Sequence, residues 1–236
     1  MVLACPNAMG SRVFTRSSGD PLVRTSPNSA KSANILAMKR STAIRHLVEV
    51  ANEATEIEKL QRPAFDLGLE ELWVAGELLD GNAAPDFGTV VGMLDVAPQE
   101  LPWMALHPSG EWVFDRLRLG KRPLIGYYRP MAWPAWNARH RGVVRFWSAT
   151  DGRDVEVIEQ LQTGTVVVSE AATDNEVRNQ LLEERAVGEA HLRRIVDTYW
   201  EGDWRREHRG QRAEDMLWRA SAGLIEIDDA LASLAR

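Results

Sequence analysis

The last third of the chain carries two long apolar stripes with helical spacing, and this feature restricts the fold most. Thr173 and Glu176 have the spacing of a capping box, in which a hydroxyl and a carboxylate each satisfy a free backbone N–H. A helix of about seven turns is expected to follow, and a second helix is expected to end the chain. The apolar residues of that second helix are Ala213, Leu217, Ala220, Leu224, Ile227, Leu231 and Leu234. Their alternating spacings of four and three predict an antiparallel helical hairpin over residues 171–236, packed on the rest of the protein; an oligomer interface is the alternative use of the stripe.

The residues before the hairpin predict a domain of helices and strands over residues 38–170. An amphipathic helix is expected to begin at Ser41 and to end before Pro63. Strands are expected at 71–75, 89–96, 124–128 and 142–147, with short helices at 110–119 and 155–161. The strand at 124–128 is expected at an edge of the sheet. The fold class that we predict is therefore α+β: a small mixed sheet with flanking helices, followed by the C-terminal helical hairpin.

The first 37 residues differ from the remainder in composition. They are rich in Ser, Thr, Asn and Pro and show no apolar period, so we expect a disordered N-terminal extension. A translation start placed too far upstream is the preferred explanation, because Met38 opens directly into the first helical pattern. An organelle transit peptide is the alternative, since the segment contains Arg and Ser but little acid.

Charge, apolar runs and cysteine content exclude several classes of protein. The first 37 residues hold four basic side chains and one acidic side chain, which leaves 24 basic and 33 acidic residues in the remainder. That acidic body makes a nucleic-acid partner an unfavoured hypothesis. There is no apolar run of about 18 residues, so no membrane span is expected. A single Cys argues against a disulfide framework and a Cys-rich zinc site. We expect a cytoplasmic protein.

One motif indicates a family. The stretch from Leu72 to Glu77, followed nine residues later by Asp86 to Val91, resembles the signature of the nucleotidyltransferase fold. In that family a strand ends in Gly-Ser, and a second strand begins with Asp-x-Asp, whose carboxylates hold magnesium on a triphosphate. The resemblance covers residues 41–147 and implies a nucleotidyltransferase-like sheet. The whole chain also looks like an uncharacterised family of bacterial proteins of unknown function, with the same order of Leu-Trp, Trp-Asn and Leu-Trp-Arg-Ala-Ser elements.

The chain departs from the nucleotidyltransferase motif where catalysis takes place. Gly76 and Asp86 match the family's glycine and first metal ligand, whereas Glu77 replaces the serine and Gly88 stands at the second carboxylate position. Two-metal phosphoryl transfer needs paired oxygen ligands. A rearranged site built from Asp86 with Glu77 or Asp95 is the alternative, and Asp86 is the candidate metal ligand. No other metal ligand and no cofactor is expected; magnesium is implied only if that alternative holds.

A second segment combines aromatic rings with cations. Trp133, Trp136, Arg139, Arg141 and Arg145 are candidate ligand-binding residues, because indoles stack on planar ligands and guanidinium groups hold phosphates. The competing interpretation is a loop whose indoles cover the core.

These patterns support three functional hypotheses. The preferred one is a catalytically inactive, nucleotidyltransferase-like module that binds a protein partner or a nucleotide, so enzymatic activity is left open and not favoured. The alternatives are an active magnesium-dependent nucleotidyl- or phosphotransferase that uses Asp86 with Glu77 or Asp95, and a small-ligand-binding protein with a Trp-lined cleft.

Overall fold

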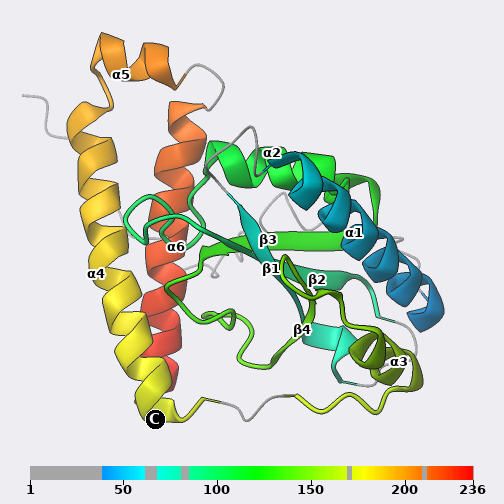
Figure 1. Ribbon diagram of the computed structural model, residues 1–236. Helices are drawn as coiled ribbons and strands as arrows, with labels where there is room; N and C mark the ends of the chain where they lie inside the picture. Colours follow the sequence, from blue (N-terminus) through cyan, green and yellow to red (C-terminus); the bar gives the residue numbers. More distant parts are fainter. Residues whose placement is uncertain (1–38, 62–67, 81–84, 169–171, 209–211, 236) are drawn as a thin grey trace, which may run out of the picture. The chain divides into compact units, whose positions relative to one another are not determined.

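The computed structural model describes residues 39–61, 68–80, 85–168, 172–208 and 212–235. All of them belong to one compact unit, Leu36–Arg236. The predicted α+β class is confirmed: a five-stranded mixed sheet is flanked by helices, and a helical region ends the chain (Figure 1). No helix in the described ranges is both long and apolar enough to cross a bilayer.

The sheet has the order β3-β2-β1-β4-β5. Strand β1 pairs antiparallel with β2 and with β4, strand β4 pairs antiparallel with β5, and only β2 and β3 run parallel. The strands are β1 (Leu69–Ala75), β2 (Gly88–Leu94), β3 (Leu124–Pro130), β4 (Val143–Ser148) and β5 (Gly152–Arg153). Strand β3 is therefore an edge strand, as the sequence suggested for residues 124–128.

Three helices cover one face of the sheet (Figure 1). They are α1 (Arg40–Gln61), α2 (Pro108–Arg116) and α3 (Val155–Thr163). Side chains alternate along each strand, so Leu72 and Val74 of β1 pack against these helices while Ala75 joins a smaller cluster on the other face. The main hydrophobic core lies between the helices and the sheet.

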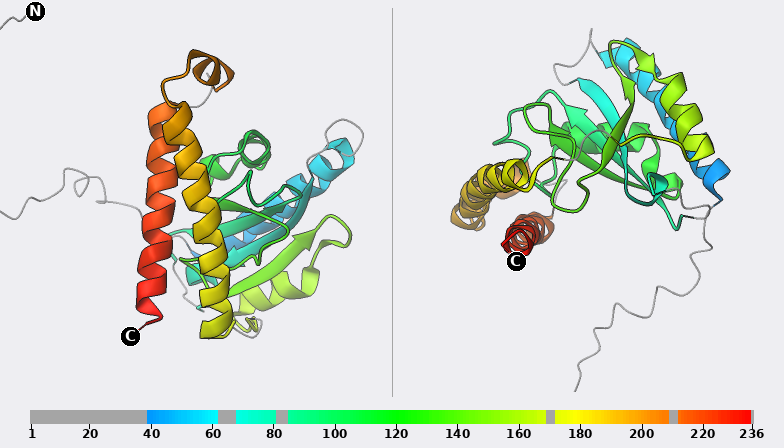
Figure 2. Two further views of the ribbon diagram at one scale, coloured as in Figure 1. Left: turned by 90° about the vertical axis from the view of Figure 1, so that its left-hand side faces the viewer. Right: turned by 90° about the horizontal axis from the view of Figure 1, so that it is seen from below.

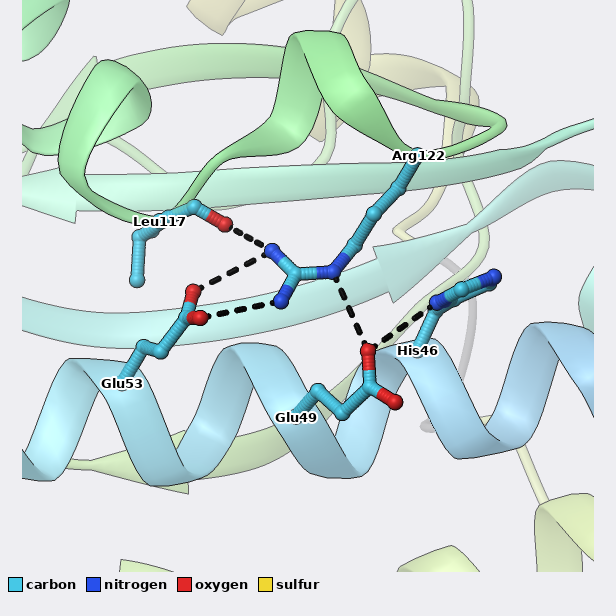
Figure 3. A network of polar contacts seen from close by, with 5 residues as sticks. All are labelled: His46, Glu49, Glu53, Leu117 and Arg122. Atoms are coloured by element: carbon cyan, nitrogen blue, oxygen red, sulfur yellow. Dashed lines mark hydrogen bonds and ion pairs between the residues drawn. The ribbon is translucent and has the colours of Figure 1, made fainter.

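An arginine network fixes helix α1 against the turn that leads into β3 (Figure 3). Arg122 donates two hydrogen bonds to the carboxylate of Glu53, at 3.0 and 3.1 Å, and one to Glu49 at 3.3 Å. Its guanidinium also donates to the carbonyl of Leu117. The hydrogen bond with His46 lowers the pKa of Glu49. The start of β3 is thus held by side chains from an element about 70 residues earlier in the chain.

The predicted helical hairpin is formed by α4 (Asp174–Thr198) and α6 (Ala213–Ser233), with a short helix α5 (Gly202–Glu207) between them. Thr173 and Glu176 form the predicted capping box. The two long helices run antiparallel (Figure 2). Contacts along them follow opposite orders, because Arg178 reaches the carbonyl of Leu234, Arg185 pairs with Asp228 and Gly188 faces Leu224.

Candidate ligand pocket at the sheet edge

The two indoles predicted to stack on a ligand both pack against other parts of the protein, and Trp136 also lines a hollow of about 700 Å³ beside the start of α4. Trp133 is buried, and its ring N–H donates to Glu183 Oε1 of α4 at 3.0 Å. Trp136 is half-buried and packs against both small hydrophobic clusters of the second sheet face. These contacts agree with the interpretation that the indoles cover the core.

The three predicted cations lie apart from one another. Arg141 pairs with Asp174 at the start of α4, with 2.8 Å between Nη1 and Oδ1. Arg145 lies on β4 and pairs with Glu71 of the neighbouring strand at 2.7 Å. Arg139 lines a pocket beside β3. The structure therefore does not gather the predicted aromatic and cationic residues into one site.

The predicted metal-site carboxylates lie at two separate places. The carboxylate of Glu77 accepts a hydrogen bond from the backbone N–H of Asp86 at 2.9 Å, so these two residues are neighbours. Asp86 precedes strand β2 and Asp95 follows it, and roughly 20 Å of extended chain separates them. No group of three His, Cys, Asp or Glu side chains in the described ranges could hold a metal ion.

The glycines of the motif have structural roles. Gly76 directly follows β1 and has a φ of +71°, a backbone conformation that favours glycine. Gly88 lies in β2, where a Cβ would stand 2.7 Å from Leu124 Cδ2 and 2.8 Å from Leu78 Cδ1. A side chain at position 88 would therefore enter the core between two leucines.

A buried ion pair joins the sheet to the hairpin. Arg129 of β3 and Glu184 of α4 are almost completely inaccessible to solvent, and Nη1 of Arg129 lies 3.2 Å from Oε2 of Glu184. The guanidinium also donates to the carbonyl of Pro134 at 2.7 Å and lies within 6 Å of the ring centres of Trp103 and Trp133. A buried charge is tolerated only when it is paired and hydrogen-bonded in this way.

A second arginine makes a similar link next to it. Arg139 donates to the carboxylate of Glu226 on α6, and its Nε lies 2.9 Å from Oε2. Glu226 also accepts the indole N–H of Trp103 at 2.9 Å. These contacts hold helix α6 against the chain around Trp103 and create one wall of a pocket.

That pocket has a volume of about 440 Å³ and lies beside strand β3. This size is within the range of sites for drug-sized ligands, roughly 300–1,000 Å³. Its walls are mainly aromatic and apolar, with three charged side chains. The lining residues are Trp103, Met104, Ala105, Leu106, Glu111, Phe114, Ile125, Gly126, Tyr127, Tyr128, Arg139 and Arg219.

The pocket holds hydrogen-bond donors that lack acceptors. Arg219 of α6 is half-buried, and no described residue forms an ion pair or hydrogen bond with its guanidinium. The hydroxyl of Tyr127 accepts from Arg139, and that of Tyr128 accepts from the N–H of His107 at 3.5 Å. Neither phenol proton has an acceptor in the part of the chain that the structure describes. Three residues with unused donors thus line one pocket with aromatic walls.

The protonation of Tyr128 keeps its donor available. Burial raises the pKa of Tyr128 to about 12, and the nearby Glu111 adds to this effect while Arg219 opposes it. The phenol therefore keeps its proton at any physiological pH. A buried neutral donor and a guanidinium together suit a ligand that carries several acceptor oxygens.

Sequence reasoning missed this pocket. Arg219 belongs to the segment Leu217-Trp218-Arg219-Ala220, and its position there is typical of a polar residue on the exposed face of an amphipathic helix. Its significance depends on which strand the helix packs beside. The one available signal was the pair Tyr127-Tyr128 on a predicted edge strand, next to the segment that contains Arg139.

A family model described as a domain of unknown function (DUF7711) matches residues 38–233. The chain belongs to this family. No curated protein and no solved structure matches the chain. The family match begins where the first amphipathic helix was expected, and the resemblance to nucleotidyltransferases stays a prediction.

Proposed function

We propose that the protein is a binding module whose edge pocket holds an anionic ligand with an aromatic or apolar part. The observation that carries this proposal is the set of unused donors: the guanidinium of Arg219 and the phenol protons of Tyr127 and Tyr128. Leaving a half-buried arginine without a counter-ion costs free energy, and a bound anion would recover it.

The partners of the two pocket arginines support an anion over a cation. Arg139 is already neutralised by Glu226, whereas Arg219 has no carboxylate within ion-pair distance among the described residues. Glu111 lines the pocket as well, so an anionic group would lie nearer to Arg219. Trp103 and Phe114 provide apolar walls for the remainder of the ligand.

Phenyl phosphate is a suitable probe because it joins a ring to a dianion. Calorimetric titration of the full chain should show binding, and Arg219→Gln should weaken it by about 10-fold or more, as expected for a hydrogen bond to a charged group. Benzyl alcohol, which lacks the charge, should bind less tightly than phenyl phosphate.

Arg193→Gln is the matched control, because Arg193 is an exposed arginine of α4 that lines a different hollow. This control should bind phenyl phosphate as the wild type does. Equal affinity of the Arg219→Gln variant and the wild type, in a protein that keeps its melting temperature, would show that the pocket is not the site.

The adjacency of Glu77 and Asp86 favours a second candidate function, a magnesium-dependent nucleotidyl- or phosphotransferase. Carboxylate oxygens are ligands that magnesium prefers. Titration with magnesium and ATP tests this candidate: micromolar binding that Asp86→Ala abolishes and Asp95→Ala preserves would support it. Absence of magnesium-dependent ATP binding would leave the inactive binding module as the preferred function.

A further inference from the structure

Four consecutive residues of the edge strand line the pocket. Residues 125–128 of β3 all contribute to its wall, and the opposite side of β3 pairs with β2 over the full length of the strand. In an edge strand every second residue directs its N–H and C=O away from the sheet. Within the described chain, no backbone hydrogen bond joins these four residues to any element other than β2. The pocket therefore contains backbone donors and acceptors as well as side chains.

This part of the edge lacks the usual protection against a further strand. Natural sheets cover an edge or place Lys or Pro on it. Arg129 and Pro130 are buried at one end of β3, but Ile125 is an apolar residue with 37% of its surface exposed. The open segment is about 13 Å long, which is enough for an added strand of four residues.

We infer that the ligand of this pocket is an extended peptide segment with a carboxylate, which adds as a strand to the outer edge of β3. The inference rests on the proposed function and names its ligand. Main-chain hydrogen bonds to β3 supply affinity that does not depend on sequence, as in other cases of strand addition. The guanidinium of Arg219 takes the carboxylate.

The two faces of β3 predict where the side chains of the peptide lie. Tyr128 packs edge-on against Phe114 of α2, with ring centres 4.9 Å apart. Tyr127 stacks on Trp103 on the other face at 5.4 Å. Successive side chains of an added strand point to opposite faces. One therefore meets Phe114 and the next meets Trp103, so apolar residues are preferred at both positions.

The experiment uses the full chain and a defined peptide, acetyl-Val-Thr-Val-Phe-Glu. Three companions carry a C-terminal amide, Gln in place of Glu, or both changes, and a series carries one N-methyl group at each backbone nitrogen in turn. Affinities are measured by calorimetry. The exchange of the amide protons of residues 125–128 is followed by nuclear magnetic resonance, with and without peptide.

If the peptide adds as a strand, its affinity and the amide exchange of β3 should both change at every second residue. N-methylation should lower the affinity by 10-fold or more at alternate residues only, and alternate amides among residues 125–128 should exchange more slowly in the complex. Removal of the carboxylate that Arg219 binds should lower the affinity to the level of the Arg219→Gln variant. The companions show whether that carboxylate is the Glu side chain or the C-terminus.

Two results would overturn the inference in distinguishable ways. If phenyl phosphate binds through Arg219 while the peptides fail to bind, or lose affinity without a period of two, strand addition is wrong and the proposed function stands. If neither phenyl phosphate nor any peptide binds, both are wrong.

Discussion

Ion pairs between side chains of different elements help to hold the helical hairpin against the sheet. Arg129 and Glu184 lie 55 positions apart in the chain, yet they form a buried pair that also engages Gln180 and the carbonyl of Pro134. Such a pair need not exceed two apolar residues in stability, but removing one partner leaves a charge without compensation.

Glu184→Ala should therefore be strongly destabilising. The expected loss in the free energy of unfolding is about 3–5 kcal/mol, measured by urea denaturation, because Arg129 stays buried without its counter-ion. Arg141→Ala, which breaks the exposed pair with Asp174, is the control and should cost less than about 1 kcal/mol. Similar losses in the two variants would contradict this account of the buried pair.

His191 should make the protein sensitive to acid. Burial, followed by the charge of Arg194, lowers the pKa of His191 to about 4, and Nδ1 of His191 accepts a hydrogen bond from Arg194 at 2.9 Å. In the unfolded chain His191 takes up a proton near pH 6.5, whereas in the folded protein it does so only near pH 4. The contribution of neutral His191 to the free energy of unfolding is therefore present above pH 6.5 and is lost as the pH falls from 6.5 towards 4.

The measurement is the melting temperature at pH 7 and pH 5 for the wild type and for His191→Gln. The wild type should lose about 1 kcal/mol more than the variant over this interval, after allowance for solvent screening, which corresponds to about 2–4 °C. Burial also lowers the pKa values of His107 and His140, so the variant should keep part of the acid sensitivity. Identical losses in both proteins would show that His191 does not contribute to the acid sensitivity.

Among the elements, helix α6 packs closely against the backbone at Trp103, and this contact limits where α6 can lie. A Cβ at Gly223 would lie 2.5 Å from the carbonyl oxygen of Trp103. At Gly188 of α4 the nearest atom, at 3.0 Å, is the end of the flexible Leu224 side chain. The first position has no room for a methyl group, whereas the second can accommodate one.

Gly223→Ala and Gly188→Ala should therefore change the free energy of unfolding in opposite directions. Alanine favours a helix by about 1 kcal/mol over glycine, so Gly188→Ala should be neutral or stabilising. Gly223→Ala should destabilise by about 1–3 kcal/mol, because the backbone contact with Trp103 must open. Chemical denaturation measures both, and a stabilised Gly223→Ala variant would show that α6 is not held this closely.

At the scale of the whole molecule, the segment before residue 38 should contribute little to stability. Its composition lacks an apolar period, and the family match begins at residue 38. Deletion of residues 1–37 should leave the melting temperature within about 2 °C, because no core is lost. A clear decrease, measured by differential scanning calorimetry, would assign the segment a role in the folded protein.

Elements with strong local patterns could be predicted from the order of their residues. The capping box at Thr173 and Glu176, the apolar stripe of α6 and the short apolar runs of β1 and β2 each depend on residues a few positions apart, so local spacing predicts them. The α+β class and the antiparallel hairpin follow from these elements.

The contacts between distant elements could not be predicted in this way and follow from the packing of the whole fold. The parallel pairing of β3 with β2, and the packing of α6 beside β3, bring Arg219 to Tyr127 and Tyr128 from about 90 positions away. Local periodicity carries no information on such pairings, because they result from the simultaneous burial of apolar faces and the compensation of buried charges across the whole unit. The pocket at the edge of β3 exists only as a consequence of that packing.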